Sequence, residues 1–335
     1  MAAVSEPTVV AAVPETLMQE FFSAEDRKRL AEVSQQLGGT FVRLDQLSEL
    51  PDLSTVRVVI TSWGAPPIDA PLLAALPSLE LVAHTGASIR ALVTDALWDR
   101  GVAVTQAGAA MARAVAEVSL AFTLALLHRI PQMHDALRRT SVWWEPTGVQ
   151  HEIFGAPIAV IGASRTGRSY LELIRALGAQ PMLVDPTLTA AQAEALGAPL
   201  VSLEEALTRA SITALHAPTL PETHHLIGAA QLALMPDGAG LVNTARSWLV
   251  DESALLTELE SGRLSAAIDV FDEEPLAPGS PFRSVPGVLL TPHRAAGTHE
   301  GRLRQGRIVA DELAAFAGGQ PLQHTVTRER LAVMG

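Results

Sequence analysis

The chain has 335 residues, no cysteine and a formal net charge of −12, and 48% of its residues are hydrophobic. This length predicts two domains with an ample core. The absence of cysteine excludes disulfides, thiol catalysis and zinc–thiolate sites, and the acidic balance argues against non-specific nucleic-acid binding, which needs a basic surface.

The chain begins with MAAVSEPTVVAAVPE, which is apolar but lacks a basic segment and contains Glu6. We interpret this stretch as a short disordered start followed by a first strand, rather than as a signal peptide. No run approaches the about 18 apolar residues that a membrane span requires. We therefore expect a cytoplasmic protein without membrane association.

Residues 8–105 alternate short apolar runs with helical patterns. We expect strands at 8–13, 40–44, 56–60, 79–84 and 102–105, and helices at about 15–37, 70–76 and 91–99. Such alternation predicts a parallel sheet with helices on both of its faces.

A long helix is predicted at 111–128, where apolar residues lie nearly all round the helix. A helix without a clear polar face is buried, either in the core or against another subunit. A second helix follows at about 131–139, and residues 141–155 form a connector that contains tryptophan, proline and glycine.

The second half of the chain again alternates strands and helices. Strands are expected at 158–161, 181–184, 200–201, 212–215, 241–243, 266–268 and 288–290, and helices at 165–177, 203–209, 229–234 and 252–261, the last capped by Asp251. A final helix at about 298–317 ends at two glycines. We expect it to pack on the first domain, which would make that domain discontinuous in sequence.

The stretch IAVIGASRTGRSYLELIRALGAQPMLVD, residues 158–185, has the pattern of a dinucleotide-binding unit: strand, tight turn, helix, strand and acid. Asp185 follows Gly162 by 23 residues, a spacing that suits hydrogen bonds to an adenosine ribose. Its charge would repel a 2′-phosphate, so the pattern favours NAD over NADP. The alternative is an ordinary strand–helix turn.

Within the turn, Gly162 allows the sharp change of direction and Gly167 allows the helix to pack closely on the strand. The amides of Arg165 and Thr166 would face a pyrophosphate at the helix N-terminus. Ser164 departs from the pattern, because a glycine usually stands there.

Three ionisable residues, Arg246, Glu274 and His293, each follow a predicted strand. The ligand crevice of an open α/β sheet lies beyond the carboxyl ends of its strands, so the three side chains could meet there. Taken singly, each has a simpler explanation: a surface cation, a loop acid and a turn histidine. Histidine is the best single candidate for catalysis, because its ordinary pKa lies near neutrality.

Three longer runs resemble the D-isomer-specific 2-hydroxyacid dehydrogenase family. They are LHAPTLPETHHLI (215–227), LVNTARSWLVDESALLTELESGRLSAAIDVFDEEPL (241–276) and TPHRAAGT (291–298), and the resemblance extends over about residues 79–320. It implies an α/β fold of two Rossmann-like domains with doubly wound parallel sheets and a cleft between them. Residues 1–107 plus 299–335 would form the substrate domain and residues 108–298 the NAD-binding domain, in a homodimer.

The resemblance also implies roles for the three ionisable residues. His293 would be the general acid/base, and Glu274 would pair with it and orient it. Arg246 would bind the substrate carboxylate and polarise the carbonyl oxygen, for which its planar donor fork is well suited. Asp269 would hold the nicotinamide carboxamide. The NAD groove would be lined by Ala217, Pro218, Thr223, Thr244 and Ala245.

Members of the family bind the substrate carboxylate through backbone amides of a loop in the first domain, which aligns here with Gly86, Ala87 and Ser88. Ser88 replaces a usual glycine, and Arg90 stands where an aspartate is common. Arg90 could bind a second anionic group of the substrate. Alternatively, it points to solvent or braces a domain contact.

The resemblance implies an NAD-dependent oxidoreductase that interconverts a small D-2-hydroxy acid and its 2-oxo acid. An NAD(H) sensor or corepressor-like protein with little turnover is the alternative, since a fold does not fix a function. Formate oxidation is disfavoured because formate dehydrogenases pair the histidine with glutamine; phosphite oxidation stays open. We expect no metal site, since His216, His224 and His225 lack partners at metal-binding spacing.

Overall fold

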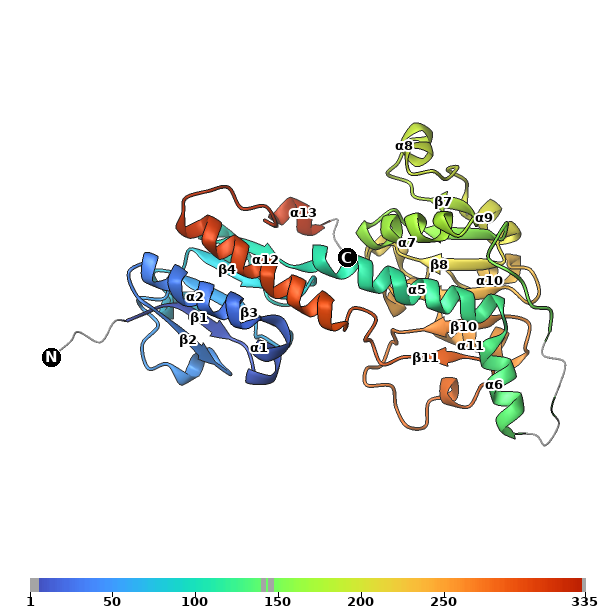
Figure 1. Ribbon diagram of the computed structural model, residues 1–335, viewed down its shortest axis with the longest axis horizontal. Helices are drawn as coiled ribbons and strands as arrows, with labels where there is room; N and C mark the ends of the chain where they lie inside the picture. Colours follow the sequence, from blue (N-terminus) through green and yellow to red (C-terminus); the bar gives the residue numbers. More distant parts are fainter. Residues whose placement is uncertain (1–5, 140–142, 144–147, 333–335) are drawn as a thin grey trace. The chain divides into compact units, whose positions relative to one another are not determined.

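A computed structural model describes residues 6–139, 143 and 148–332 (Figure 1). The predicted disordered start and residues 141, 142 and 144–147 of the predicted 141–155 connector lie outside the described residues. The chain divides into two compact units. Unit 1 contains the described residues up to Met111 and from Gly297 onward, and unit 2 contains Ala112–Ala296.

Unit 1 is built on a five-stranded parallel sheet with the order β2-β1-β3-β4-β5. Its strands are β1 (Pro7–Ala12), β2 (Thr40–Leu44), β3 (Val58–Thr61), β4 (Leu81–His84) and β5 (Ala103–Gln106). Its helices are α1 (Glu15–Phe21), α2 (Ala24–Gln36), α3 (Ala70–Ala75), α4 (Asp95–Asp99), α12 (His299–Ala317) and α13 (Arg328–Ala332). Short 3₁₀ turns cover Leu47–Glu49 and Gly108–Met111.

Both faces of the unit 1 sheet are covered. On one face, Val309, Ala310 and Leu313 of α12 share a core with residues of α1, α2 and the strands. Successive strand residues point to opposite faces, and residues of the other face, such as Val59 and Val82, are also fully buried. The last long helix therefore covers one face of a sheet whose strands all come from the first part of the chain.

The single helix predicted at 15–37 is wrong. The structure breaks it into α1 and α2 at Phe22 and Ser23, because Ser23 caps the second helix. The Ser23 hydroxyl accepts the Asp26 N–H at 3.1 Å, and the Asp26 carboxylate accepts the Ser23 N–H at 3.2 Å. The helix predicted at 91–99 likewise starts late, at Asp95, after the cap Thr94.

Unit 2 is built on a six-stranded parallel sheet with the order β11-β10-β9-β8-β6-β7. Its strands are β6 (Pro157–Ile161), β7 (Gln180–Val184), β8 (Ile212–Leu215), β9 (Gly240–Asn243), β10 (Ser265–Ile268) and β11 (Leu289–Leu290). The strand predicted at 200–201 is reduced to a single bridge between Leu183 and Leu200. The order reverses between β6 and β8, and ligands bind at such a switch point.

Helices cover both faces of this sheet as well. They are α5 (Ala112–Leu127), α6 (Ile130–Arg139), α7 (Arg165–Ala176), α8 (Ala190–Ala195), α9 (Leu203–Arg209), α10 (Ala229–Leu234) and α11 (Glu252–Glu260). One core cluster joins the strands to α5 and α7, and the other joins them to α9, α10 and α11. Each unit thus has the predicted α/β architecture with a doubly wound parallel sheet.

The segment Gly108–Leu127 is long and apolar enough to cross a membrane by length and composition. The expectation that nothing in the chain spans a membrane stays a prediction, because this criterion rests on length and composition alone. Half of its most apolar window is buried within the protein, which is what a core helix of a globular protein also shows.

Candidate active site

The turn after β6 leaves no room for side chains at its two glycines. Gly162 has a φ of +101°, and a Cβ on it would lie 2.6 Å from the backbone of Ala217. A Cβ on Gly167 would lie 2.1 Å from the carbonyl oxygen of Gly162. These contacts fix the close packing of α7 on β6 that the sequence pattern predicts.

Ser164 has a structural role that the sequence analysis missed. It is the N-cap of α7, and its hydroxyl accepts the Gly167 N–H at 3.2 Å. The preference of serine for this position was the available signal. The amides of Arg165 and Thr166 have no acceptor among the described residues. This helix start therefore fits a pyrophosphate, which needs free N–H groups and the positive end of a helix dipole.

Asp185, just after β7, forms hydrogen bonds with the turn after β6 and with its own loop. One carboxylate oxygen accepts the Ala163 N–H at 2.7 Å, and the other accepts the Thr187 N–H at 2.9 Å and hydroxyl at 2.6 Å. Burial opposes its ionisation, but these hydrogen bonds and the charge of Arg168 hold the pKa of the carboxyl below its ordinary value. An ionised carboxylate has about four lone-pair sites, so one remains for a ribose hydroxyl.

The predicted groove residues follow β8 and β9. Ala217 contacts the Gly162 turn, and the Thr223 hydroxyl donates to the Pro218 carbonyl at 2.7 Å, which closes the loop after β8. After β9, the Thr244 hydroxyl lies 2.7 Å from the Ser119 hydroxyl of α5. Since Ser119 donates its single proton to the Val115 carbonyl, Thr244 must be the donor in this pair.

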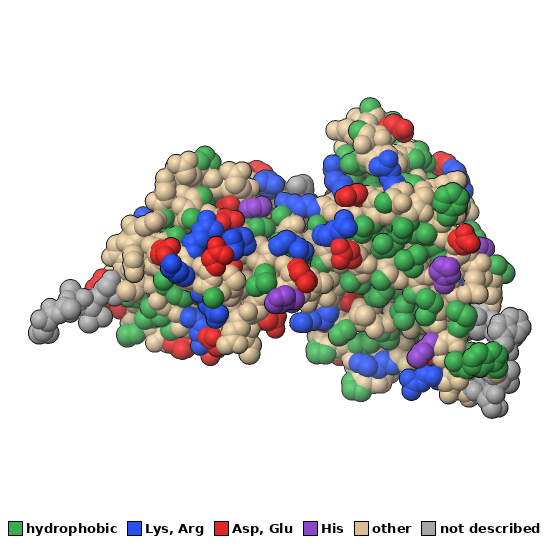
Figure 2. Space-filling view, in the orientation of Figure 1, with side chains coloured by type: hydrophobic (Ala, Val, Ile, Leu, Met, Phe, Trp, Pro, Cys, Tyr) green, Lys and Arg blue, Asp and Glu red, His purple; other side chains and the backbone are tan. Residues whose placement is uncertain are grey.

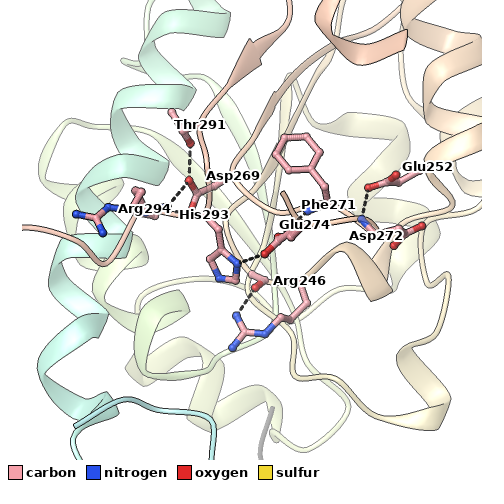
Figure 3. Close-up of polar contacts among 11 residues, drawn as sticks. Arg246, Glu252, Asp269, Phe271, Asp272, Glu274, Thr291, His293 and Arg294 are labelled. Atoms are coloured by element: carbon pink, nitrogen blue, oxygen red, sulfur yellow. Dashed lines mark hydrogen bonds and ion pairs between the residues drawn. The ribbon is translucent and has the colours of Figure 1, made fainter. Parts of the chain in front are cut away.

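His293 and Glu274 form a close pair (Figure 3). The Nδ1 atom of His293 lies 2.7 Å from Oε2 of Glu274, and the other Glu274 oxygen accepts the Phe271 N–H at 3.0 Å. Both side chains keep contact with solvent, at 46% and 36% exposure. With Nδ1 held by the carboxylate, Nε2 is the nitrogen available for proton exchange with a ligand.

Arg246 lies beside this pair (Figure 3). Burial lowers the pKa of its guanidinium, and the negative charge of nearby Glu274 opposes that shift. The Asn243 side chain fixes the backbone here: its amide donates to the Arg246 carbonyl at 2.9 Å, and its oxygen accepts the Ala245 N–H at 3.1 Å. The structure thus brings together the guanidinium, carboxylate and imidazole that the sequence places after three separate strands.

Asp269 contacts the loop that carries His293, which the sequence analysis did not foresee. Its side chain is 1% exposed and accepts the Thr291 hydroxyl and the N–H groups of Arg294 and Ala295, the last two at 2.9 Å. These bonds flank His293, whose φ of +52° is a left-handed conformation that non-glycine residues rarely adopt. Asp269 therefore anchors the histidine loop.

In unit 1, the loop after β4 has several free donors. The amides of Gly86, Ala87 and Ser88 have no acceptor among the described residues. A Cβ on Gly86 would lie 2.8 Å from Nε2 of His84 and 2.9 Å from Nε1 of Trp63, so a side chain here would displace one of these rings. Arg90 is exposed.

Four further histidines lie outside the His293–Glu274 pair, two of them buried and two stacked on each other. Burial lowers the pKa of His216 to about 3, and that of His84 to about 4, so both rings are neutral at physiological pH. The rings of His224 and His225 stack at 3.9 Å. Among the described residues, no group of three or more histidine, aspartate or glutamate side chains could hold a metal ion.

Known proteins resemble this chain over most of its length. The model of the D-isomer specific 2-hydroxyacid dehydrogenase, NAD binding domain, matches residues 120–295. D-3-phosphoglycerate dehydrogenase of Mycobacterium tuberculosis is 33% identical over 315 residues, which are 94% of this chain and 56% of that protein. Glyoxylate reductase of Aeropyrum pernix is 34% identical, over 79% of this chain and 82% of its own length.

The crystal structure of a phosphoglycerate oxidoreductase from Rhizobium etli is also similar, with a TM-score of 0.77 at 27% identity, covering 96% of this chain and 99% of the other. This chain spans about half the length of the D-3-phosphoglycerate dehydrogenases that it matches. The match to the family model lies within residues 120–295, and the match to glyoxylate reductase covers 82% of that protein. Neither match depends on the extra length of the D-3-phosphoglycerate dehydrogenases. The chain therefore belongs to the D-isomer-specific 2-hydroxyacid dehydrogenase family and carries its NAD-binding domain.

Proposed function

We propose that this protein is an NAD-dependent dehydrogenase that interconverts a small D-2-hydroxy acid and its 2-oxo acid. The observation that carries this proposal is the convergence of Arg246, Glu274 and His293 in the unit that holds the dinucleotide turn. An NAD(H) sensor without turnover would have no need of all three groups.

Bound NAD would supply the hydride chemistry. During oxidation of the hydroxy acid, His293 would take the hydroxyl proton at Nε2, and during reduction it would return a proton to the carbonyl oxygen. Glu274, held 2.7 Å from Nδ1, fixes the tautomer and stabilises the protonated ring. The reaction thus needs one proton-transfer group, and the pair supplies it.

Arg246 would bind the substrate carboxylate and stabilise the negative charge that grows on the carbonyl oxygen. Its partial burial strengthens such an interaction, because few water molecules compete for the guanidinium. In unit 1, we propose that the free amides of Gly86, Ala87 and Ser88 bind an anionic group, and that Arg90 recognises a second anionic group on larger substrates.

The test is a panel of 2-oxo acids with NADH, followed by the loss of its absorbance. Glyoxylate and hydroxypyruvate test small substrates, pyruvate and bulkier 2-oxo acids test the size limit, and 3-phosphohydroxypyruvate tests a second anion. We expect turnover of at least one compound, with NADH preferred over NADPH. Binding of NADH without reduction of any member of the panel would favour the sensor instead.

The protein is further proposed to act as a homodimer. Hydrophobic side chains gather on the face of unit 2 that carries α5 and α7 (Figure 2). On α6, Ile130, Met133 and Leu137 are exposed at helical spacing, which suits an interface. Light scattering of the purified protein should give twice the mass of one chain; the mass of one chain would exclude the dimer.

A further inference from the structure

Glu252, the first residue of α11, reaches from that helix to the loop that carries Glu274 (Figure 3). One oxygen of the half-buried Glu252 carboxylate accepts the Asp272 N–H at 2.8 Å. The preceding amide, that of Phe271, donates to Glu274 at 3.0 Å. Two successive amides of one loop are therefore held by two carboxylates, one of which pairs with His293 at 2.7 Å.

The geometry of Glu274 depends on the backbone of this loop. Its Oε1 atom accepts the Phe271 N–H, and its Oε2 atom faces the imidazole. The Phe271 ring is buried and packs on Phe282 with ring centres 6.2 Å apart, which anchors one side of the loop. Asp272 is exposed, so the bond to Glu252 anchors the side that faces solvent.

The place of Glu252 is electrostatically unfavourable. Burial raises the pKa of its carboxyl, and the charges of Asp272 and Glu274 raise it further, against the opposing effect of the Asp272 N–H. An acidic residue in the first turn of a helix stabilises that helix by about 0.3–1 kcal/mol. However, Asp251 already caps α11 by accepting the Ala254 N–H at 3.0 Å. Helix stability alone does not account for a third carboxylate beside two others.

We propose that Glu252 is a positioning residue for the Glu274–His293 pair: its hydrogen bond to the Asp272 amide holds the loop so that Glu274 meets the imidazole. This inference rests on the proposed dehydrogenase function for its consequence in turnover. The position of the pair itself is testable without turnover.

Three variants separate the hydrogen bond from the charge. Glu252→Ala removes the acceptor, whereas Glu252→Gln keeps an acceptor oxygen and removes the charge. Glu273→Ala is the matched control, because Glu273 is an exposed acid of the same loop with no hydrogen bond or ion pair among the described residues. Thermal melting of all three shows whether each is folded.

The expected result is a tenfold lower kcat for Glu252→Ala, which corresponds to about 1.4 kcal/mol in the barrier, with NADH affinity within twofold of the unmodified protein. Glu252→Gln and Glu273→Ala should keep at least half of the original kcat. A Glu252→Ala variant with kcat within twofold of the unmodified protein would overturn the inference. So would a Glu252→Gln variant as slow as Glu252→Ala, since the charge would then be responsible.

The second measurement is the proton NMR resonance of His293 Nδ1–H, assigned by its loss in His293→Ala. It should persist in Glu252→Gln and Glu273→Ala and disappear in Glu252→Ala, because the partner carboxylate is no longer held. Persistence in all variants, or absence from the unmodified protein, overturns the inference. This readout decides the matter even if no 2-oxo acid is reduced, a result that would refute only the proposed function.

Discussion

Replacing Asp269 by asparagine tests whether this buried carboxylate anchors the histidine loop. One carboxylate oxygen accepts two donors, from Thr291 and Arg294, and the other accepts the Ala295 N–H. The best asparagine rotamer places its oxygen where the carboxylate oxygen accepts from Thr291 and Arg294. Its NH₂ group then faces the Ala295 N–H, which is also a donor. Two buried donors then lack an acceptor, at about 1–3 kcal/mol each, and two hydrogen bonds lose their charged acceptor.

We therefore expect the free energy of unfolding of unit 2 to fall by about 2–6 kcal/mol. Urea unfolding measures the change, with amide exchange to assign the transition to Ala112–Ala296. Asp272→Asn is the control, because it makes the same chemical change on an exposed side chain nearby. The kcat should fall as well, since the strained His293 backbone loses its support. A loss below about 0.5 kcal/mol, the usual range for surface substitutions, would refute the anchoring role.

Three further predictions concern catalysis, cofactor choice and acid stability. His293→Ala should lower kcat by about 10²–10⁴-fold while NADH affinity stays within twofold, and an unchanged kcat would exclude the acid/base role. Asp185→Ala should raise the NADP-to-NAD ratio of kcat/KM by removing the charge that repels a 2′-phosphate; an unchanged ratio would exclude a contact with the ribose. His84 and His216 have folded pKa values of about 4 and about 3 because of burial, against 6.5 in the unfolded chain. Unfolding therefore takes up protons below about pH 6.5, and each ring should cost about 2 kcal/mol of stability between about pH 7 and 5. Urea titrations that give the same stability at both pH values would show that burial does not lower the pKa of these rings.

Local patterns predicted most of the fold because each strand is a short apolar run between clear breakers. The break at Ser23 escaped prediction because the apolar spacing continues on both sides of it, from Met18 and Phe21 to Leu30 and Val33. The short helix α8 was missed for a related reason. Its six residues carry little periodicity, although Thr189 and Gln192 form a capping box at its start.

The site could be predicted in part. Arg246, Glu274 and His293 follow strands of one parallel sheet, so topology alone brings them near one edge. The contacts of Asp269 with Arg294 and of Glu252 with Asp272 could not be predicted in this way. They join residues 25 and 20 positions apart through irregular loops, whose conformation depends on many weak contacts rather than on a repeating pattern.

The discontinuity of unit 1 has a consequence during synthesis. Gly297 follows Met111 by 186 residues, and α12, which supplies Val309, Ala310 and Leu313 to the core of unit 1, begins only after it. At a translation rate of about 5–20 residues per second, the ribosome needs roughly ten to forty seconds to bridge that interval. During this time the strands β1–β5 lack the helix that covers one face of their sheet, whereas unit 2 emerges as one uninterrupted segment. A chaperone that shields the early strands would therefore act in this interval.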